Sequence, residues 1–221
     1  MVDGLRGGLK IRGPGGEIGT ISSWAGRRIN EFIESMGVEE VSQPVMPESL
    51  VKFLGGSRVA GVEFGWVEPD AVPEPYHGLL VHHGDMTSRL AEYHEEAIVL
   101  EILQAGQVEG EYLREVVLRG AGSKNAVEYG IIEVHLVNFL PSMQAAILEG
   151  GQPLGGILVE TGTVFGSSPL GYFRVKADVV GDIFSTSPDG AVLFGRYNQL
   201  LGEDGVCLAR IIEILPGVPE S

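Results

Sequence analysis

Residues 112–119 read YLREVVLR, and this stretch carries the period of two that is typical of a β-strand. In an extended chain, Arg114 shares one face with three large apolar or aromatic side chains, whereas Glu115 and Arg119 lie on a second, more polar face. A charged residue in line with apolar neighbours is unusual on a face that packs against a core. The stretch therefore predicts both a half-buried strand and a guanidinium that needs a partner.

Similar patterns lie on both sides of this strand. Further strands are expected at residues 97–105, 126–136, 156–160, 172–180, 191–200 and 206–215, joined by turns that contain glycine. Short helices are expected from Asp85 or Thr87 to about Tyr93, and over residues 141–148, where Gly150 ends the second one. Many strands with few helices predict an α+β fold dominated by one antiparallel sheet.

The first third of the chain has a different composition. Residues 1–20 are rich in glycine and are expected to form a loop or a flexible arm. A helix is expected over residues 23–36, and the five prolines between 38 and 80 leave no ordered set of elements there. The sequence therefore predicts an N-terminal extension over 1–80 and a sheet domain over 81–221. The extension is open to three interpretations: a lid, a dimer arm or a separate subdomain.

Composition limits the classes of partner and compartment. The chain has 221 residues, with 15 Lys and Arg against 30 Asp and Glu, for a net charge of −15. This balance disfavours nucleic acid, because phosphate binding needs clustered basic residues. The single cysteine, Cys207, favours a reducing compartment, and no apolar run is long enough to cross a membrane. We expect a cytoplasmic protein; the oligomeric state is not indicated.

Arg114 and Glu213 are the two residues most open to a chemical role. A buried guanidinium needs either a ligand carboxylate or an internal ion pair with an acidic residue. The segment 208–215 is apolar except for Arg210 and Glu213, so this carboxylate is also expected to be partly buried. It fits proton transfer, a hydrogen bond to a ligand hydroxyl, or a salt bridge to Arg114, Arg174 or Arg196.

Other reactive residue types carry weaker signals. His82 and His83 are expected to be solvated loop residues, because no third ligand stands at metal-like spacing, and no metal site is predicted. His135 is expected to be a core histidine with satisfied hydrogen bonds, and Cys207 a small core residue. The sequence contains no Walker loop, nucleophile elbow or dinucleotide fingerprint.

Four segments together resemble the chorismate pyruvate-lyase (4-hydroxybenzoate synthase) family over about residues 84–216. The Gly-Asp-Met-Thr at 84–87 is similar to the family's entry motif, and the strand 112–118 to its Leu-Arg-Glu strand. Residues 148–158, with Pro-Leu-Gly at 153–155, are similar to the turn that follows a helix, and 213–216 to the closing strand. The resemblance implies a chorismate lyase-like fold.

The resemblance also implies a site and a reaction. Arg114 would hold the ring carboxylate, main-chain groups at Met86 and Leu154 would assist, and Glu213 would contact the oxygen at the 4-position. Arg114 and Glu213 would be catalytic in a carbon–oxygen lyase that eliminates pyruvate from chorismate. Such a reaction needs neither a metal nor an organic cofactor.

Three departures from the family pattern keep two alternatives open. Glu213 stands one residue nearer to the final proline than the family's glutamate, and Ile131 and Ile132, with Glu128 and Glu133 nearby, occupy a region where the family often has arginine. The first 80 residues are not covered by the resemblance. One alternative is another enzyme of secondary metabolism, a cyclase or a lyase for a different carboxylate. The other is a module that senses a small carboxylate.

Overall fold

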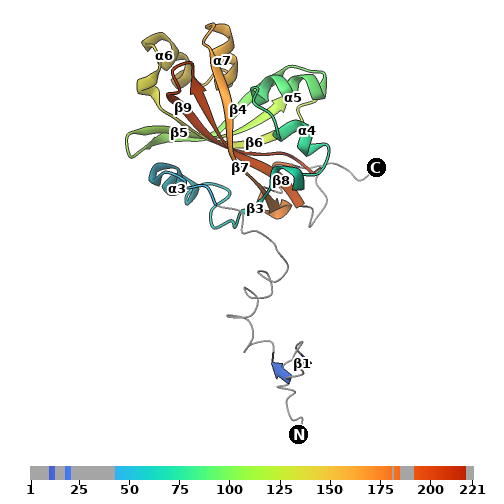
Figure 1. Ribbon diagram of the computed structural model, residues 1–221. Helices are drawn as coiled ribbons and strands as arrows, with labels where there is room; N and C mark the ends of the chain where they lie inside the picture. The colour runs from blue at the N-terminus through green and yellow to red at the C-terminus, as the bar shows by residue number, and fades with distance from the viewer. Residues whose placement is uncertain (1–9, 13–17, 21–42, 181, 185–191, 218–221) are drawn as a thin grey trace. The chain divides into compact units, whose positions relative to one another are not determined.

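The computed structural model describes residues 10–12, 18–20, 43–180, 182–184 and 192–217 (Figure 1). The chain divides into two compact units, Met1–Ser42 and Gln43–Ser221. In the first unit, strands β1 (Lys10–Arg12) and β2 (Ile18–Thr20) pair antiparallel, within the stretch that the sequence assigned to a loop. The helix expected over residues 23–36 lies outside the described residues.

The second unit is built around a seven-stranded sheet in the order β3-β7-β8-β9-β6-β5-β4. Every neighbouring pair is antiparallel, which confirms the predicted α+β class with a single antiparallel sheet. The strands are β3 (Gly65–Val67), β4 (Ile98–Val108), β5 (Glu111–Gly120), β6 (Ala126–Val134), β7 (Phe165–Lys176), β8 (Val192–Gly202) and β9 (Cys207–Ile214).

In the described part of this unit, five α-helices accompany the sheet: α3 (Glu48–Leu54), α4 (Tyr76–Leu80), α5 (Met86–His94), α6 (Pro141–Glu149) and α7 (Leu154–Glu160). Single turns of 3₁₀-helix lie at Pro69–Ala71, Leu136–Asn138 and Ala177–Val179. Within the described ranges, no helix is both long and apolar enough to cross a lipid bilayer.

Residues 43–80 belong to the same compact unit as the sheet, although the sequence placed the division after residue 80. Strand β3 pairs with β7, with Trp66 opposite Phe173, and the two rings meet edge to face at 5.5 Å. Leu50 of α3 is completely buried in the core beneath the sheet. A three-residue strand and a seven-residue helix between prolines give too little periodicity to be recognised in the sequence.

The prediction of a strand at residues 156–160 is wrong, because this segment lies inside helix α7. Pro153 is the N-cap of the helix, a place where its fixed φ suits the start of a helix. Leu154, Ile157 and Leu158 are buried, which is the three-and-four spacing of a helical face. The run of apolar residues in this segment fits either period, and packing against α6 decides in favour of the helix.

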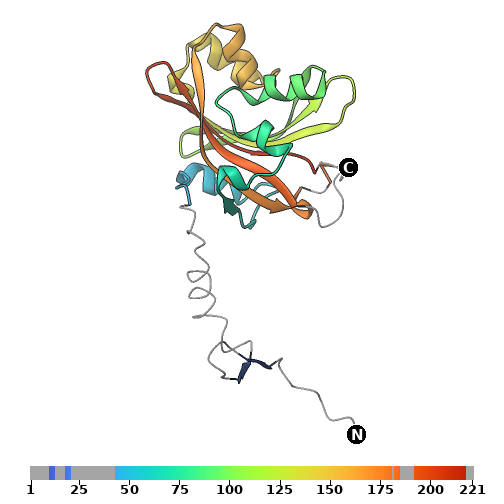
Figure 2. The same ribbon diagram turned by 45° about the vertical axis from the view of Figure 1, so that its right-hand side comes forward.

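Both faces of the sheet are covered. Helices α4 to α7 lie on one face, and α3 lies on the other (Figures 1 and 2). The face of Glu115 and Arg119 was expected to be the more polar one, but it is largely core, because Leu113 and Val117 on this face are buried beneath α3. Glu115 is buried among them and accepts a hydrogen bond of 2.6 Å from the Tyr129 hydroxyl.

Candidate functional site

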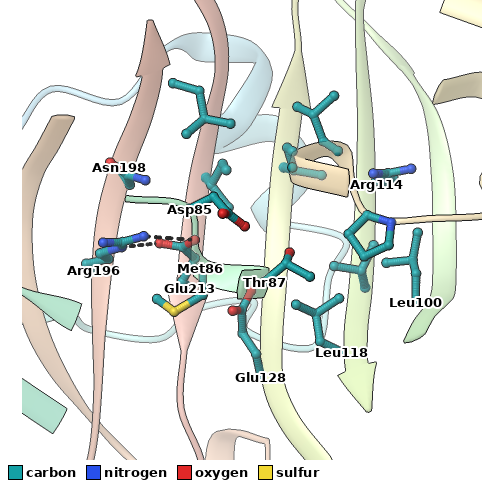
Figure 3. A pocket seen from close by; sticks show the side chains of 17 residues that line it. Asp85, Met86, Thr87, Leu100, Arg114, Leu118, Glu128, Arg196, Asn198 and Glu213 are labelled. Carbon is teal, nitrogen blue, oxygen red and sulfur yellow. Dashed lines mark hydrogen bonds and ion pairs between the residues drawn. The ribbon is translucent and has the colours of Figure 1, made fainter. Parts of the chain in front are cut away.

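A cavity of about 60 Å³ lies between the sheet and the first turns of α5 and α7 (Figure 3). The four residues that the sequence marked as a site, Met86, Arg114, Leu154 and Glu213, all line it. The remaining lining residues are Asp85, Thr87, Leu100, Val116, Leu118, Glu128, Ile132, Pro153, Gly155, Arg196, Asn198, Leu200 and Ile211. The structure thus brings the four expected residues together, whereas their roles stay predictions.

The register of the sheet explains why these side chains meet. Cross-strand partners in an antiparallel sheet point to the same face. One row of partners runs from Arg196 through Glu213 and Gly130 to Val116. The next row runs from Asn198 through Ile211 and Ile132 to Arg114. Glu213 therefore faces the cavity, despite its one-residue departure from the family pattern.

Arg114 is buried without a charged partner. It is 1% exposed, and its Nη1 donates a long hydrogen bond of 3.5 Å to the carbonyl oxygen of Ile147. Nε has no partner, and no carboxylate in the described part of the chain lies within ion-pair distance. Burial lowers the pKa of the guanidinium, because the interior disfavours its charged form. The internal ion pair considered from the sequence is not formed among the described residues.

Arg196 is also completely buried, but it is fully engaged. Its Nε and Nη2 donate to the two carboxylate oxygens of Glu213. Its Nη1 donates to the carbonyl oxygens of Leu80, at 2.9 Å, and His82, at 3.3 Å. Of the three salt-bridge partners considered for Glu213, the structure therefore selects Arg196. The pair is satisfied before any ligand arrives.

Glu128 is a cavity residue that sequence reasoning noted only as a departure from the family. Its side chain is buried, and its Oε2 has no hydrogen-bond partner. The pKa of this carboxyl lies well above its usual range because burial disfavours the charge, and the nearby Glu213 carboxylate adds to this effect. Arg196 opposes the shift without reversing it. Glu128 therefore holds its proton more tightly than an exposed glutamate.

Unpartnered polar atoms gather at this cavity. Asn198 accepts a hydrogen bond of 3.0 Å from the Ser167 hydroxyl, but its Nδ2 has no partner. Together with Arg114 Nε and Glu128 Oε2, it makes three of the five buried side-chain atoms without a partner in the described chain. Each such atom costs about 1–3 kcal/mol when it stays unpaired. Their concentration around one cavity indicates a place for a polar ligand.

The first turn of α5 adds a second source of positive potential. Asp85 is its N-cap, and the Asp85 carboxylate accepts the N–H of Ser88 at 2.9 Å. The N–H groups of Met86 and Thr87, in the first turn, have no partner inside the helix. Helix α7 starts close by: a side chain at Gly155 would place its Cβ 3.1 Å from Asp85 Oδ1. Glycine at this position allows the two helix starts to meet over the cavity.

Other candidate residues lie away from the cavity. His82 is not a solvated loop residue, because its half-buried ring accepts the N–H of Gly84 at 3.1 Å. Burial and the charge of Arg196 lower its pKa to about 4. His135 follows the last residue of β6, and its Nδ1 lies 2.9 Å from a Glu111 carboxylate oxygen. Within the described ranges, no cluster of three or more His, Cys, Asp or Glu side chains could hold a metal ion.

The sequence of this chain matches no family model and no curated protein. Several solved structures are similar to it, among them the following three. The effector domain of PhnF from Mycobacterium smegmatis is 11% identical and covers 61% of this chain and 89% of its own, with a TM-score of 0.43. PhnF from Mycobacterium smegmatis is 10% identical and covers 85% and 93%, with a TM-score of 0.48. The possible transcriptional regulator YydK from Bacillus subtilis is 10% identical and covers 88% and 96%, with a TM-score of 0.41.

These names contradict the expectation of a carbon–oxygen lyase. One structure is an effector domain and another a possible transcriptional regulator, and none of the three is named as a lyase. The expected links to chorismate, 4-hydroxybenzoate, pyruvate and biosynthesis are therefore withdrawn. The exclusion of nucleic acid from the net charge is likewise not supported, since a similar protein is named as a possible transcriptional regulator. What stands is the fold class and the cavity.

Proposed function

We propose that the unit Gln43–Ser221 is a ligand-binding module that senses a small organic carboxylate. The observation that carries the proposal is Arg114, which is buried at one end of the cavity with Nε unsatisfied and with no carboxylate partner among the residues that the structure describes. An arginine matches a carboxylate through two parallel hydrogen bonds, which a point charge such as lysine cannot make. A ligand carboxylate would therefore satisfy the group that the fold leaves open.

The surroundings of Arg114 suit the rest of such a ligand. The first-turn N–H groups of Met86 and Thr87 place the positive end of α5 at the same cavity. Apolar side chains from five strands form its floor, and Val116, Ile132 and Ile211 are among them. Specific small-molecule sites combine an apolar lining with a few polar groups in this way. The chain's negative net charge does not prevent this, because the attraction acts at contact.

The arrangement favours binding over turnover because the carboxylate considered for proton exchange is already paired. Glu213, once considered for proton exchange, is held by two hydrogen bonds from Arg196. Met86 and Leu154 contribute apolar side chains and helix-start backbone to the lining. The roles we assign are therefore carboxylate capture for Arg114 and shaping of the cavity for Met86, Leu154 and Glu213.

The loop between α4 and α5 connects the cavity mechanically to the surface. Arg196 contacts Glu213 in the cavity and holds the carbonyl groups of Leu80 and His82 in that loop. The same loop is tied to β7 by the backbone bond from Ser167 to His83, at 3.1 Å. A ligand that shifts the Arg196 side chain would therefore shift the start of α5. This connection supports a sensing role.

Calorimetric titration of the full chain with benzoate and with hexanoate tests the proposal. We expect binding to wild type and a loss of at least about tenfold in affinity for Arg114→Met, since the charge-assisted bidentate contact disappears. Arg119→Met is the matched control, because Arg119 lies on the same strand, points to the opposite face and pairs with Glu101. The affinity of Arg119→Met for these carboxylates should equal that of wild type.

Incubation with chorismate, followed by separation of the products, tests binding against turnover. We expect neither 4-hydroxybenzoate nor pyruvate above the rate without protein. Formation of both products by wild type, and its loss in Arg114→Met, would overturn the proposal. Equal carboxylate affinity in wild type and Arg114→Met would overturn the role of Arg114.

A further inference from the structure

Charge is distributed unevenly between the two ends of the cavity. At one end, Arg114 has a positive charge without a carboxylate (Figure 3). At the other, Glu128 and Glu213 present two carboxyl groups to a single guanidinium, that of Arg196. The fold thus leaves one cation without an anion and one carboxyl group without a cation.

At the second end, the N–H donors of Arg196 are nearly all engaged in hydrogen bonds. Arg196 gives Nε and Nη2 to Glu213 and Nη1 to two backbone carbonyl groups. The free capacity is the unpartnered Oε2 of Glu128. An ammonium group of a ligand would donate a hydrogen bond to this oxygen, and its positive charge would balance the second carboxyl group in its ionised form.

The sheet makes room for the Glu128 carboxyl at the cavity floor. Glycine at 130, next to Glu213 in the register, has no side chain to fill the cavity floor, and a Cβ there would lie 3.2 Å from Glu128 Oε1. Glu128 is opposite Leu118, four residues along β5 from Arg114. Four residues span about 13 Å along a strand. Because both side chains reach into the cavity, the gap between their polar groups is shorter and suits a small molecule.

We propose that the ligand is a zwitterion, whose carboxylate binds Arg114 and whose amino group, at the opposite end of an apolar body, binds Oε2 of Glu128. This inference rests on the proposed function and specifies its ligand class. Burial raises the pKa of Glu128 in the empty cavity, whereas an ammonium group donates to the carboxylate form, so binding should release a proton from Glu128 to solvent. The other charged groups around Glu128 are Glu213 of β9, Arg196 of β8 and Asp85 at the start of α5, with the Tyr172 hydroxyl beyond Arg196 on β7.

Matched ligands of equal size test the inference by calorimetry on the full chain. The ring series is 4-(aminomethyl)benzoate, 4-(hydroxymethyl)benzoate and 4-ethylbenzoate; the linear pair is 5-aminopentanoate and hexanoate. We expect the amine of at least one series to bind wild type about tenfold more tightly than its alkyl counterpart, because hydrogen bonds to charged groups are the stronger ones. In Glu128→Gln, this ratio should fall to nearly one while the alkyl ligand keeps its affinity.

Proton release provides a measurement that needs no variant. Titrations in phosphate and in Tris, which differ in ionisation enthalpy, should show release of up to one proton on binding of the amine and none on binding of the alkyl ligand. Equal affinity of amine and alkyl ligands in both series, or binding of the amine without proton release, would overturn the zwitterion while leaving the module intact. If no carboxylate binds in an Arg114-dependent manner, the proposed function itself fails.

Discussion

Arg114 and Arg196 lie on the same face of the sheet, each no more than 1% exposed, yet only Arg196 is paired with a carboxylate in the described part of the chain. Arg196 forms a structural ion pair with Glu213, which links β8 to β9, and a hydrogen bond to Leu80, which links β8 to the segment before α5. Arg114 has no carboxylate partner among the described residues to account for its burial. A buried charge without a partner destabilises a fold, and so its presence is best explained by a ligand that supplies the partner.

Removal of the Arg114 charge should stabilise the empty protein. Methionine has a similar volume and no group to leave unpaired, so we expect Arg114→Met to raise the free energy of unfolding by about 1–3 kcal/mol. Urea denaturation of the ligand-free protein measures this. A loss of stability would show that Arg114 holds a structural contact after all, contrary to its proposed role.

The same substitution at Arg196 should lower the free energy of unfolding. Arg196→Met leaves Glu213 buried without its cation and leaves the carbonyl groups of Leu80 and His82 without their donor. Removal of one partner of a buried ion pair costs about 3–5 kcal/mol. Arg174→Met, at an exposed position on the neighbouring strand, is the control and should change stability little. If Arg196→Met were as stable as the control, the buried pair would have no structural role.

Glu128 should make stability fall as pH rises. Because its pKa is raised in the folded chain, the folded state retains a proton that the unfolded state loses above its ordinary pKa of about 4.5. This contribution is fully present below that pH and is lost as pH rises toward the folded pKa. We therefore expect Glu128→Gln to gain in stability over wild type between pH 5 and pH 8.

Urea denaturation across that range measures the gain. Glu149→Gln, at an exposed position on α6, should show no such trend. A difference between Glu128→Gln and wild type that stays constant with pH would contradict the raised pKa.

Asp85 has two separable effects. Asp85→Ala removes the cap on Ser88 and should cost about 1 kcal/mol of stability, whereas Asp85→Asn keeps a capping oxygen and should cost little. Asp85→Asn also removes a negative charge from the cavity, so carboxylates should bind more tightly, by about 1 kcal/mol. Calorimetry on both variants separates the effects. Weaker carboxylate binding by Asp85→Asn would mean that Asp85 itself contacts the ligand through its charge.

The sequence predicted the sheet because its long strands alternate clearly. The alternation around Arg114 placed this residue on an apolar face, and the structure places it there. The short elements of residues 43–80 were missed because a strand such as β3 is too brief to show a period. Helix α7 was mistaken for a strand because an apolar run fits either period until its packing is known.

The site was predictable only as far as single strands allow. Glu128, Arg196 and Asn198 become cavity residues through the pairing of β6 and β8 with β9, and register across a sheet cannot be derived from one sequence. Arg196 was at least considered as a partner of Glu213. For Glu128, the useful signal was an acidic residue in an otherwise apolar strand, and a buried acid of this kind merits the same scrutiny that Arg114 received.

Side-chain nuclear magnetic resonance of the arginine Nε–H groups tests the central claim most directly. In the ligand-free protein, Arg114 Nε has no acceptor, whereas Arg196 Nε donates to Glu213. On titration with benzoate, we predict that the Arg114 Nε–H proton signal moves downfield to saturation and that the signal of Arg119, the control on the opposite face of the sheet, stays in place. Saturable benzoate binding that leaves the Arg114 signal unchanged would contradict the account.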